Sequence, residues 1–196
     1  IASHDRFRQL MARAKDGSAC VTAVVHPCSA DAMRAVAEAA DAGIVVPILI
    51  GPAARMTNAA KDAGVDIAAF RVIDVPHSHA AAAEAVARVR AGEAALLMKG
   101  SLHTDELMGA VVSSDTGLRT ERRISHAYVI DVPGYPRPLI ITDAAINIEP
   151  TLEDKADIAR NAIDLAHVIG IEQPRVAILA AVETVNPKMR TTLDAA

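Results

Sequence analysis

Short apolar runs alternate with helical stripes over the first 111 residues, and this alternation constrains the fold more than any other feature. The runs lie at 21–25, 44–50, 70–75 and 94–98. Each is followed by apolar side chains at helical spacing, as Met33 and Val36 follow the first run. Runs this short and this uniformly apolar are typical of strands buried on both faces. The sequence therefore predicts an α/β fold with a mainly parallel sheet flanked by helices.

Turn and cap residues indicate where the helices of this first part begin. An opening amphipathic helix is expected over residues 5–14. Ser29 is a good N-cap for the next helix, and Pro52 is expected at the tolerated first position of the one after it. Further helices are expected to start near Ser78 and at 101–104.

The pattern changes near Ser125. Residues 126–132 and 139–142 read as two strands joined by a turn with three prolines and a glycine, which predicts an antiparallel hairpin. Thr151 then begins a helix with an acidic variant of the capping box.

We expect one more strand at 176–179 and a last helix from 189 to 196. The strand–helix alternation and the later hairpin together suggest two domains. We predict a first α/β domain over 1–125 and part of a second α/β domain over 126–196.

Composition excludes several classes of protein. The formal net charge is −4 and aromatic residues make up 2% of the chain, which argues against a nucleic-acid surface. No apolar run approaches the roughly 18 residues of a membrane span. Cys20 and Cys28 do not suggest a disulfide framework, so we expect a reduced, cytoplasmic protein.

An anion site is suggested where the fourth apolar run ends. Lys99 and Gly100 come directly after it, and Ser101 to Thr104 open the following helix. Glycine lets the backbone approach a ligand closely, and a helix start presents unpaired N–H groups to anions. The alternative is an ordinary surface lysine with Ser101 and Thr104 as helix caps.

Three arginines follow within five residues, at 119, 122 and 123. The planar guanidinium binds phosphate through two hydrogen bonds, so this segment could hold phosphate or the phosphates of coenzyme A. The alternative is a solvated basic turn with Glu121 as a partner.

Polar residues also follow the later strands. Asp143 could orient an arginine or cap a turn, and Asn147 could bond a carbonyl, with turn chemistry as the simpler interpretation. Glu183 and Asn186 follow the run at 176–179, and Asn186-Pro187 is also a good helix-entry turn.

Other chemistries find no support in the sequence. His77 and His79 are at the start of a helix and do not form a zinc motif with any cysteine pair. The Gly-x-Ser-x-Gly motif, the Rossmann glycine fingerprint and the P-loop are absent from the 196 residues.

Several motifs together resemble the phosphate acetyltransferase/phosphate butyryltransferase family. They are Met98-Lys99-Gly100, Gly117-Leu118-Arg119-Thr120, Ser125-His126, Thr142-Asp143-Ala144-Ala145-Ile146-Asn147 and Ala181-Val182-Glu183-Thr184-Val185-Asn186-Pro187-Lys188-Met189. The likeness continues from Val24-Val25-His26-Pro27 to Gly51-Pro52. It is nearest to the butyryltransferase branch and to the acyltransferase half of bifunctional enoyl-CoA hydratase/phosphate acetyltransferases.

The resemblance implies an activity. It is exchange of an acetyl or butyryl group between coenzyme A and inorganic phosphate, in which the thiolate attacks the acyl phosphate directly. The implied partners are acyl-CoA, phosphate and acyl phosphate, with coenzyme A as substrate and no tightly bound cofactor. The implied assembly is a homodimer of two-domain subunits, related in outline to isocitrate and isopropylmalate dehydrogenases.

The resemblance also implies roles for particular residues. Lys99, Arg119 and Thr120 would hold the phosphate or acyl phosphate, and Thr142, Asp143 and Asn147 would line the cleft from the second domain. The expected substrate-binding residues are Lys99, Gly100, Ser101, Thr104, Arg119, Thr120, Thr142, Asp143, Asn147, Glu183 and Asn186.

One departure from the family concerns catalysis. The family's catalytic aspartate lies near the carboxyl end of the full chain and has no match here, so no general base is assigned. We expect the 196 residues to be part of a longer protein.

Two other interpretations remain. A non-catalytic α/β module could bind a phosphate-containing metabolite or a partner enzyme through the same anion site. A dehydrogenase of the isocitrate/isopropylmalate type has related architecture, but no metal-binding aspartate cluster supports it.

Overall fold

The computed structural model describes residues 5–196, which divide into two compact units. One unit is Met11–Thr120, and the other comprises the residues up to Leu10 together with Glu121–Ala196. The helices are α1 Asp5–Asp16, α2 Ala30–Asp41, α3 Ala53–Ala63, α4 Ser78–Arg90, α5 Thr104–Val111, α6 Leu152–Val168 and α7 Arg190–Asp194. The strands are β1 Cys20–Val25, β2 Val45–Gly51, β3 Arg71–Asp74, β4 Leu96–Lys99, β5 Ala127–Ile130 and β6 Leu139–Thr142. The domain limits of 1–125 and 126–196 stay a prediction.

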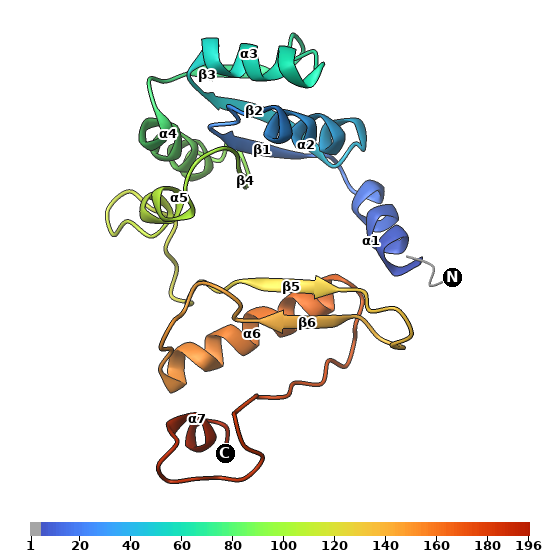
Figure 1. Ribbon diagram of the computed structural model, residues 1–196, viewed down its shortest axis with the longest axis vertical. Coiled ribbons are helices and arrows are strands. Elements are labelled where there is room, and N and C mark those ends of the chain that lie inside the picture. Colours follow the sequence, from blue (N-terminus) through green and yellow to red (C-terminus); the bar gives the residue numbers. More distant parts are fainter. Residues whose placement is uncertain (1–4) are drawn as a thin grey trace. The chain divides into compact units, whose positions relative to one another are not determined.

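The unit Met11–Thr120 is built on the predicted parallel sheet (Figure 1). Its strand order is β3-β2-β1-β4, and every neighbouring pair runs parallel. The central strand β1 pairs along its whole length with β2, and from Thr22 to Val25 with β4. The four predicted strands and the α/β class are therefore confirmed.

Alternate side chains of β1 and β2 pack on opposite faces of this sheet. Val24 and Leu49 contact Met33 of α2 and Met56 of α3 on one face. On the other face, a second buried cluster contains Ala23, Val25, Ile48, Ile50, Ala81, Ala82, Ala85 and Leu107. Burying a side chain as large as Leu49 contributes about 2 kcal/mol to the stability of the fold. The two apolar layers together therefore hold the sheet and its edges in place.

The ends of α2 and α3 follow the expected cap chemistry with one difference. Ser29 caps α2 by accepting a hydrogen bond from the Ala32 N–H, as predicted. Gly64 ends α3 with a φ of 69°, a conformation that suits glycine. Pro52 is the N-cap of α3 and not its first helical residue, because its ψ of 112° is still extended. The prediction for Pro52 was wrong by one position.

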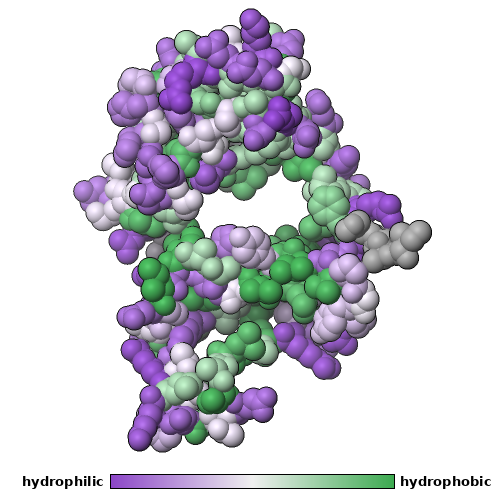
Figure 2. Space-filling view, in the orientation of Figure 1, coloured by the Kyte–Doolittle hydropathy of each residue, from purple (hydrophilic) through white to green (hydrophobic). Residues whose placement is uncertain are grey.

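The second unit contains the predicted antiparallel hairpin. Strands β5 and β6 pair with Ala127 opposite Thr142, and α6 packs against β6. Thr151 and Asp154 form the expected capping box at the start of α6. Apolar side chains gather over the hairpin in Figure 2. Val129 of β5 and Ile141 of β6 are 39% and 49% exposed.

The prediction of a strand at 176–179 was wrong. These residues have no regular structure, and Val176, Ile178 and Leu179 are 52%, 53% and 86% exposed. The local apolar pattern is that of a strand, but a strand forms only beside a partner. Within residues 5–196 no strand pairs with this run.

The last predicted helix is shorter than expected, since α7 covers only Arg190–Asp194. Among the described residues, none of the helices combines the length and the apolar character needed to cross a bilayer.

Candidate anion-binding site

The strand order creates a place where loops diverge. The chain runs from β1 to β2 and β3 on one side, and β4 then pairs on the other side of β1. The loops that follow β1 and β4 therefore leave the carboxyl edge of the sheet next to each other. In open α/β sheets, ligands bind at such switch points. Lys99, Gly100 and Ser101 lie here, as the sequence predicts for residues at the end of a parallel strand.

Gly100 lets the two loops meet. A Cβ atom at this position would lie 2.5 Å from the Val25 carbonyl oxygen and 2.7 Å from that of His26. The same closeness permits backbone hydrogen bonds from Gly100 N to Val25 O, at 2.9 Å, and from Ser101 N to His26 O, at 2.8 Å. No side chain fits there, so glycine is required for the loop after β4 to follow the end of β1.

The polar side chains of this edge come from both loops. The Lys99 ammonium donates to the Leu102 carbonyl at 2.9 Å, and no carboxylate among the described residues pairs with it. The Ser101 hydroxyl donates to the Ser29 hydroxyl at 2.8 Å. An ammonium without a carboxylate partner, on the same loop as an exposed serine hydroxyl, is chemistry that suits an anion.

The capping interpretation of Ser101 and Thr104 was wrong. The N-cap of α5 is His103, whose side chain makes no capping bond, and Thr104 is the first helical residue. The Ser101 hydroxyl instead donates to the Ser29 hydroxyl, because the backbone at Gly100 and Ser101 runs beside the end of β1. Asp105 and Glu106 occupy the first turn of α5, and their charges oppose an anion at that helix start.

Cys28 lies in the loop after β1 but lacks the character of a nucleophile. Burial raises the pKa of the Cys28 thiol, and nearby Arg55 lowers it less. A raised pKa keeps the thiol protonated near neutral pH, and the thiolate is the reactive form.

Arg119 lies on a separate loop of the same unit. The backbone of this loop is fixed by bonds from Leu118 N to Val111 O, at 2.7 Å, and from the Arg90 guanidinium to Gly117 O, at 3.0 Å. Arg119 itself is exposed, and among residues 5–196 it makes no hydrogen bond or ion pair. Thr120, the next residue, is also exposed.

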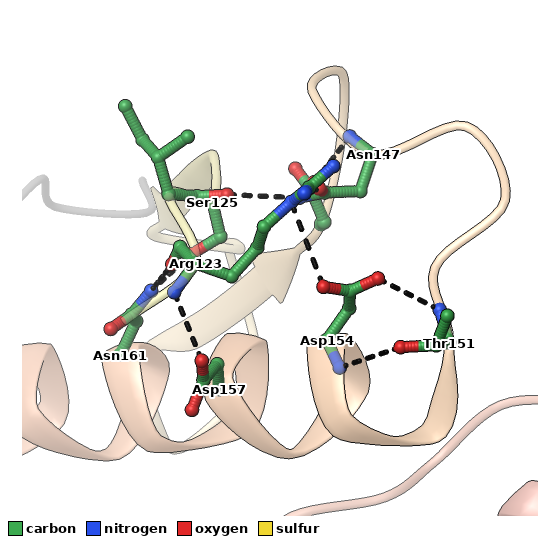
Figure 3. A network of polar contacts seen from close by, with 9 residues as sticks. Arg123, Ser125, Asn147, Thr151, Asp154, Asp157 and Asn161 are labelled. Carbon is green, nitrogen blue, oxygen red and sulfur yellow. Dashed lines mark hydrogen bonds and ion pairs between the residues drawn. The ribbon is translucent and has the colours of Figure 1, made fainter. Parts of the chain in front are cut away.

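Arg122 and Arg123 are held by α6 and the turn before it. Arg122 pairs with Asp164, and the Arg123 guanidinium donates to Asn147 Oδ1 at 2.7 Å (Figure 3). The backbone N–H of Arg123 donates to Asp157, and Asn161 donates to the Arg123 carbonyl. The structure thus separates the three arginines into two bound to their own unit and one available to a ligand.

Asp143 and Asn147 hold a turn together. The carboxylate of Asp143 accepts hydrogen bonds from the backbone N–H groups of His126, at 2.9 Å, and Asn147, at 2.7 Å. Burial raises the pKa of Asp143, but these bonds and that from the Asn147 amide outweigh it and leave the pKa below its usual value. The Thr142 hydroxyl donates to the His126 carbonyl at 2.9 Å. These contacts are the turn chemistry that the sequence offered as an alternative.

The two later candidates differ in their contacts. Asn186 accepts from the Lys188 N–H at 2.9 Å, and its backbone bonds the Thr192 hydroxyl, which is helix-entry chemistry before α7. Glu183 is exposed, and no hydrogen bond or ion pair of it exists among the described residues. Also within residues 5–196, no group of three His, Cys, Asp or Glu side chains is placed to hold a metal ion.

Sequence reasoning missed one residue of the switch point. His26 was named only within the segment Val24-Val25-His26-Pro27, with no role of its own. It is buried at 4% exposure, and its Nδ1 lies 3.1 Å from the Ser101 carbonyl oxygen. The partners are 75 positions apart, so no local pattern indicates the contact.

The fold is that of an α/β protein, and its switch point carries Lys99 and Ser101 as a candidate anion site. Residues 78–196 match the family described as "Phosphate acetyl/butaryl transferase". The chain belongs to this phosphate acetyl/butyryl transferase family, which confirms the family resemblance.

Similar proteins carry names from both halves of the family. The chain is 53% identical over 195 residues to a phosphate acetyltransferase of Rhizobium meliloti, covering 100% of this chain and 62% of that relative. It is 36% identical over 190 residues to a phosphate butyryltransferase of Clostridium acetobutylicum, covering 97% of this chain and 63% of that relative. By its motifs the likeness is nearest to the butyryltransferase branch, whereas identity is higher to this acetyltransferase than to this butyryltransferase.

Solved structures agree on the fold. A branched-chain phosphotransacylase from Enterococcus faecalis V583 superposes with a TM-score of 0.73 at 24% identity, covering 90% of this chain and 61% of that chain. A phosphotransacetylase from Streptococcus pyogenes superposes with a TM-score of 0.76 at 17% identity, covering 94% of this chain and 66% of that chain. The chain thus spans less than two thirds of the length of these proteins.

Proposed function

We propose that the protein containing this chain exchanges an acyl group between coenzyme A and inorganic phosphate. Family membership over residues 78–196 is the observation that carries the proposal. That segment includes Lys99 and Arg119, which pair with no carboxylate among the described residues, and the Ser101 hydroxyl.

The proposed reaction needs placement and charge neutralisation more than a reactive side chain. The thiolate sulfur of coenzyme A attacks the carbonyl carbon of the acyl phosphate, a C–S bond forms, and the C–O bond to phosphate breaks. The electron pair of that bond leaves with the phosphate, and the reverse reaction consumes acyl-CoA. Lys99 and Arg119 would stabilise the negative charge that gathers on the leaving phosphate.

The protein side chains would act mainly by positioning. Holding the two substrates in reacting geometry removes much of the entropic barrier of a bimolecular step. Direct transfer without an acyl-enzyme is proposed from the family resemblance. Burial raises the pKa of the Cys28 thiol, which does not favour its use as a nucleophile. No residue among 5–196 is assigned as the general base for the coenzyme A thiol.

The proposal leaves the acyl chain as acetyl or butyryl. Relatives bear both names, and the two chains differ by two methylenes, which change binding by only a few kcal/mol. We further propose a homodimer without a tightly bound cofactor, following the family resemblance. A cytoplasmic location is supported by Cys20 and Cys28, which are both unpaired.

The test is a coupled assay of the whole protein. Acetyl-CoA and butyryl-CoA are mixed with inorganic phosphate, thiol release is followed by a chromogenic disulfide, and acyl phosphate is trapped with hydroxylamine. We expect thiol and acyl hydroxamate in equal amounts, with a rate that depends on phosphate. Phosphate binding by calorimetry without turnover would instead support the non-catalytic binding module.

A further inference from the structure

His26 has a backbone conformation that is unusual for its residue type. It directly follows β1, and its φ of 54° lies in the left-handed region. Residues with a Cβ atom adopt this region rarely, with Asn, Asp and His the most tolerant, and they persist there only where surrounding contacts favour it. Its side chain is buried, although imidazole is polar. Both features indicate that His26 makes specific contacts.

Those contacts converge on Ser101. The His26 carbonyl accepts the Ser101 N–H at 2.8 Å, and the His26 Nδ1 lies 3.1 Å from the Ser101 carbonyl oxygen. Because a carbonyl only accepts, Nδ1 must carry the proton and donate. The other ring nitrogen, Nε2, is buried and has no hydrogen-bond partner among residues 5–196. The bond to Ser101 is therefore the one polar contact of the side chain within this part of the chain.

The neighbouring residues make room for this arrangement. A Cβ atom at Gly51 would lie 3.3 Å from His26 Cα and 3.7 Å from its Cδ2, so the ring sits against the end of β2. Gly100 packs on the His26 carbonyl from the other side. His26 thus lies between the ends of β2 and β4, and its side chain bonds only the loop after β4.

The result is that both backbone polar groups of Ser101 are held by one residue. With its backbone fixed, the Ser101 hydroxyl reaches the Ser29 hydroxyl at 2.8 Å, and Ser29 in turn caps α2. We propose that His26 is a positioning residue that holds Ser101 so that its hydroxyl, paired with Ser29, meets the phosphate or acyl phosphate. This inference rests on the proposed function for the identity of the ligand.

Two substitutions separate the hydrogen bond from the backbone strain. Asparagine tolerates a positive φ, and its Nδ2 is as many bonds from Cα as the Nδ1 of histidine, so His26→Asn keeps a donor. Glycine tolerates the same φ but has no donor, so His26→Gly removes only the side chain. We expect His26→Gly to raise the KM for phosphate roughly three- to tenfold over His26→Asn, with kcat changed less.

A double-mutant cycle tests whether His26 acts through Ser101. On a Ser101→Ala background, His26→Gly is expected to change the KM for phosphate less than about twofold, because the hydroxyl it positions is gone. Thr22→Val is the matched control: Thr22 is buried in β1, the strand that His26 follows, and within residues 5–196 its hydroxyl bonds only the Cys20 carbonyl. This control should lower the melting temperature and leave the KM unchanged.

Two measurements do not require turnover. The ¹⁵N spectrum of the labelled imidazole reports which nitrogen is protonated, and calorimetry gives the Kd for inorganic phosphate in each variant. We expect the Nδ1–H form and a Kd that rises in His26→Gly but not in His26→Asn. An Nε2–H tautomer, equal phosphate affinity in the two variants, or additive effects in the cycle would overturn the inference. If the wild type shows no turnover but the variants still show this pattern of phosphate affinity, the proposed function is overturned and the role of His26 is not.

Discussion

Replacing Arg119 with alanine should weaken phosphate binding without weakening the fold. Arg119 is exposed and makes no hydrogen bond or ion pair among residues 5–196, so its removal should change the free energy of unfolding by less than about 0.5 kcal/mol. A hydrogen bond to a charged group is worth about 1.5–3 kcal/mol when a phosphate is bound. The KM for phosphate should therefore rise roughly 10- to 100-fold.

The neighbouring arginines provide matched controls. Arg123→Ala removes the bond to Asn147 and the pair with Asp154, so unfolding should become easier by about 1–2 kcal/mol. Arg122→Ala removes the ion pair with Asp164, in which the two side chains are 45% and 61% exposed. It should lower the free energy of unfolding by only about 0–1 kcal/mol. Neither should alter the KM for phosphate by more than a factor of about two.

The assay is thiol release by the whole protein at varied phosphate, with the melting temperature of each variant measured in parallel. Arg119→Lys should recover part of the affinity, since lysine keeps the charge but loses the planar fork. The reasoning is refuted if Arg119→Ala keeps the wild-type phosphate dependence while Arg122→Ala or Arg123→Ala loses it. It is also refuted if activity and melting temperature fall together in Arg119→Ala.

Three further predictions concern the loops and the second unit. Gly100→Ala places a methyl group 2.5 Å from the Val25 carbonyl oxygen and should destabilise the protein by about 1–3 kcal/mol while raising the KM for phosphate; an unchanged urea midpoint would contradict the close approach. Thr151→Ala removes half of the capping box and should cost about 1 kcal/mol in urea unfolding, and a loss below the error of the method would show that α6 does not need the cap. Asp143 has a pKa below its unfolded value of about 3.9, so it adds stability above about pH 4 that is lost as the pH falls through the folded pKa. The stability difference between the wild type and Asp143→Asn should therefore shrink below about pH 4, and a difference that grows in acid would reverse the sign of this effect.

Local periodicity was enough to predict the first sheet. Strands β1 and β2 are buried on both faces over most of their length, so their sequences are largely apolar and stand out from the helical stripes. The order of the strands could not be predicted in the same way, because an apolar run shows that a strand is buried but not which strand lies beside it. The run at 176–179 shows the same limit, since its pattern is correct for a strand but no strand within residues 5–196 pairs with it.

The candidate site was predictable where its residues are local. Lys99 and Gly100 stand at the end of β4 because the strand's length fixes where it ends. The roles of the arginines were not predictable, because Arg123 is held by residues 24 to 38 positions away and Arg119 is not held at all within the described chain. The bond between His26 and Ser101 depends on β4 pairing with β1, which only the folded sheet reveals.

Isotope exchange can test whether the acyl group passes directly between coenzyme A and phosphate. Labelled inorganic phosphate is mixed with unlabelled acetyl phosphate or butyryl phosphate and the whole protein, with and without catalytic coenzyme A. Because the acyl group must pass to the thiol before a new phosphate can accept it, we predict that label enters acyl phosphate only when coenzyme A is present. Exchange without coenzyme A would indicate an acyl-enzyme, and no exchange under either condition would contradict the proposed activity.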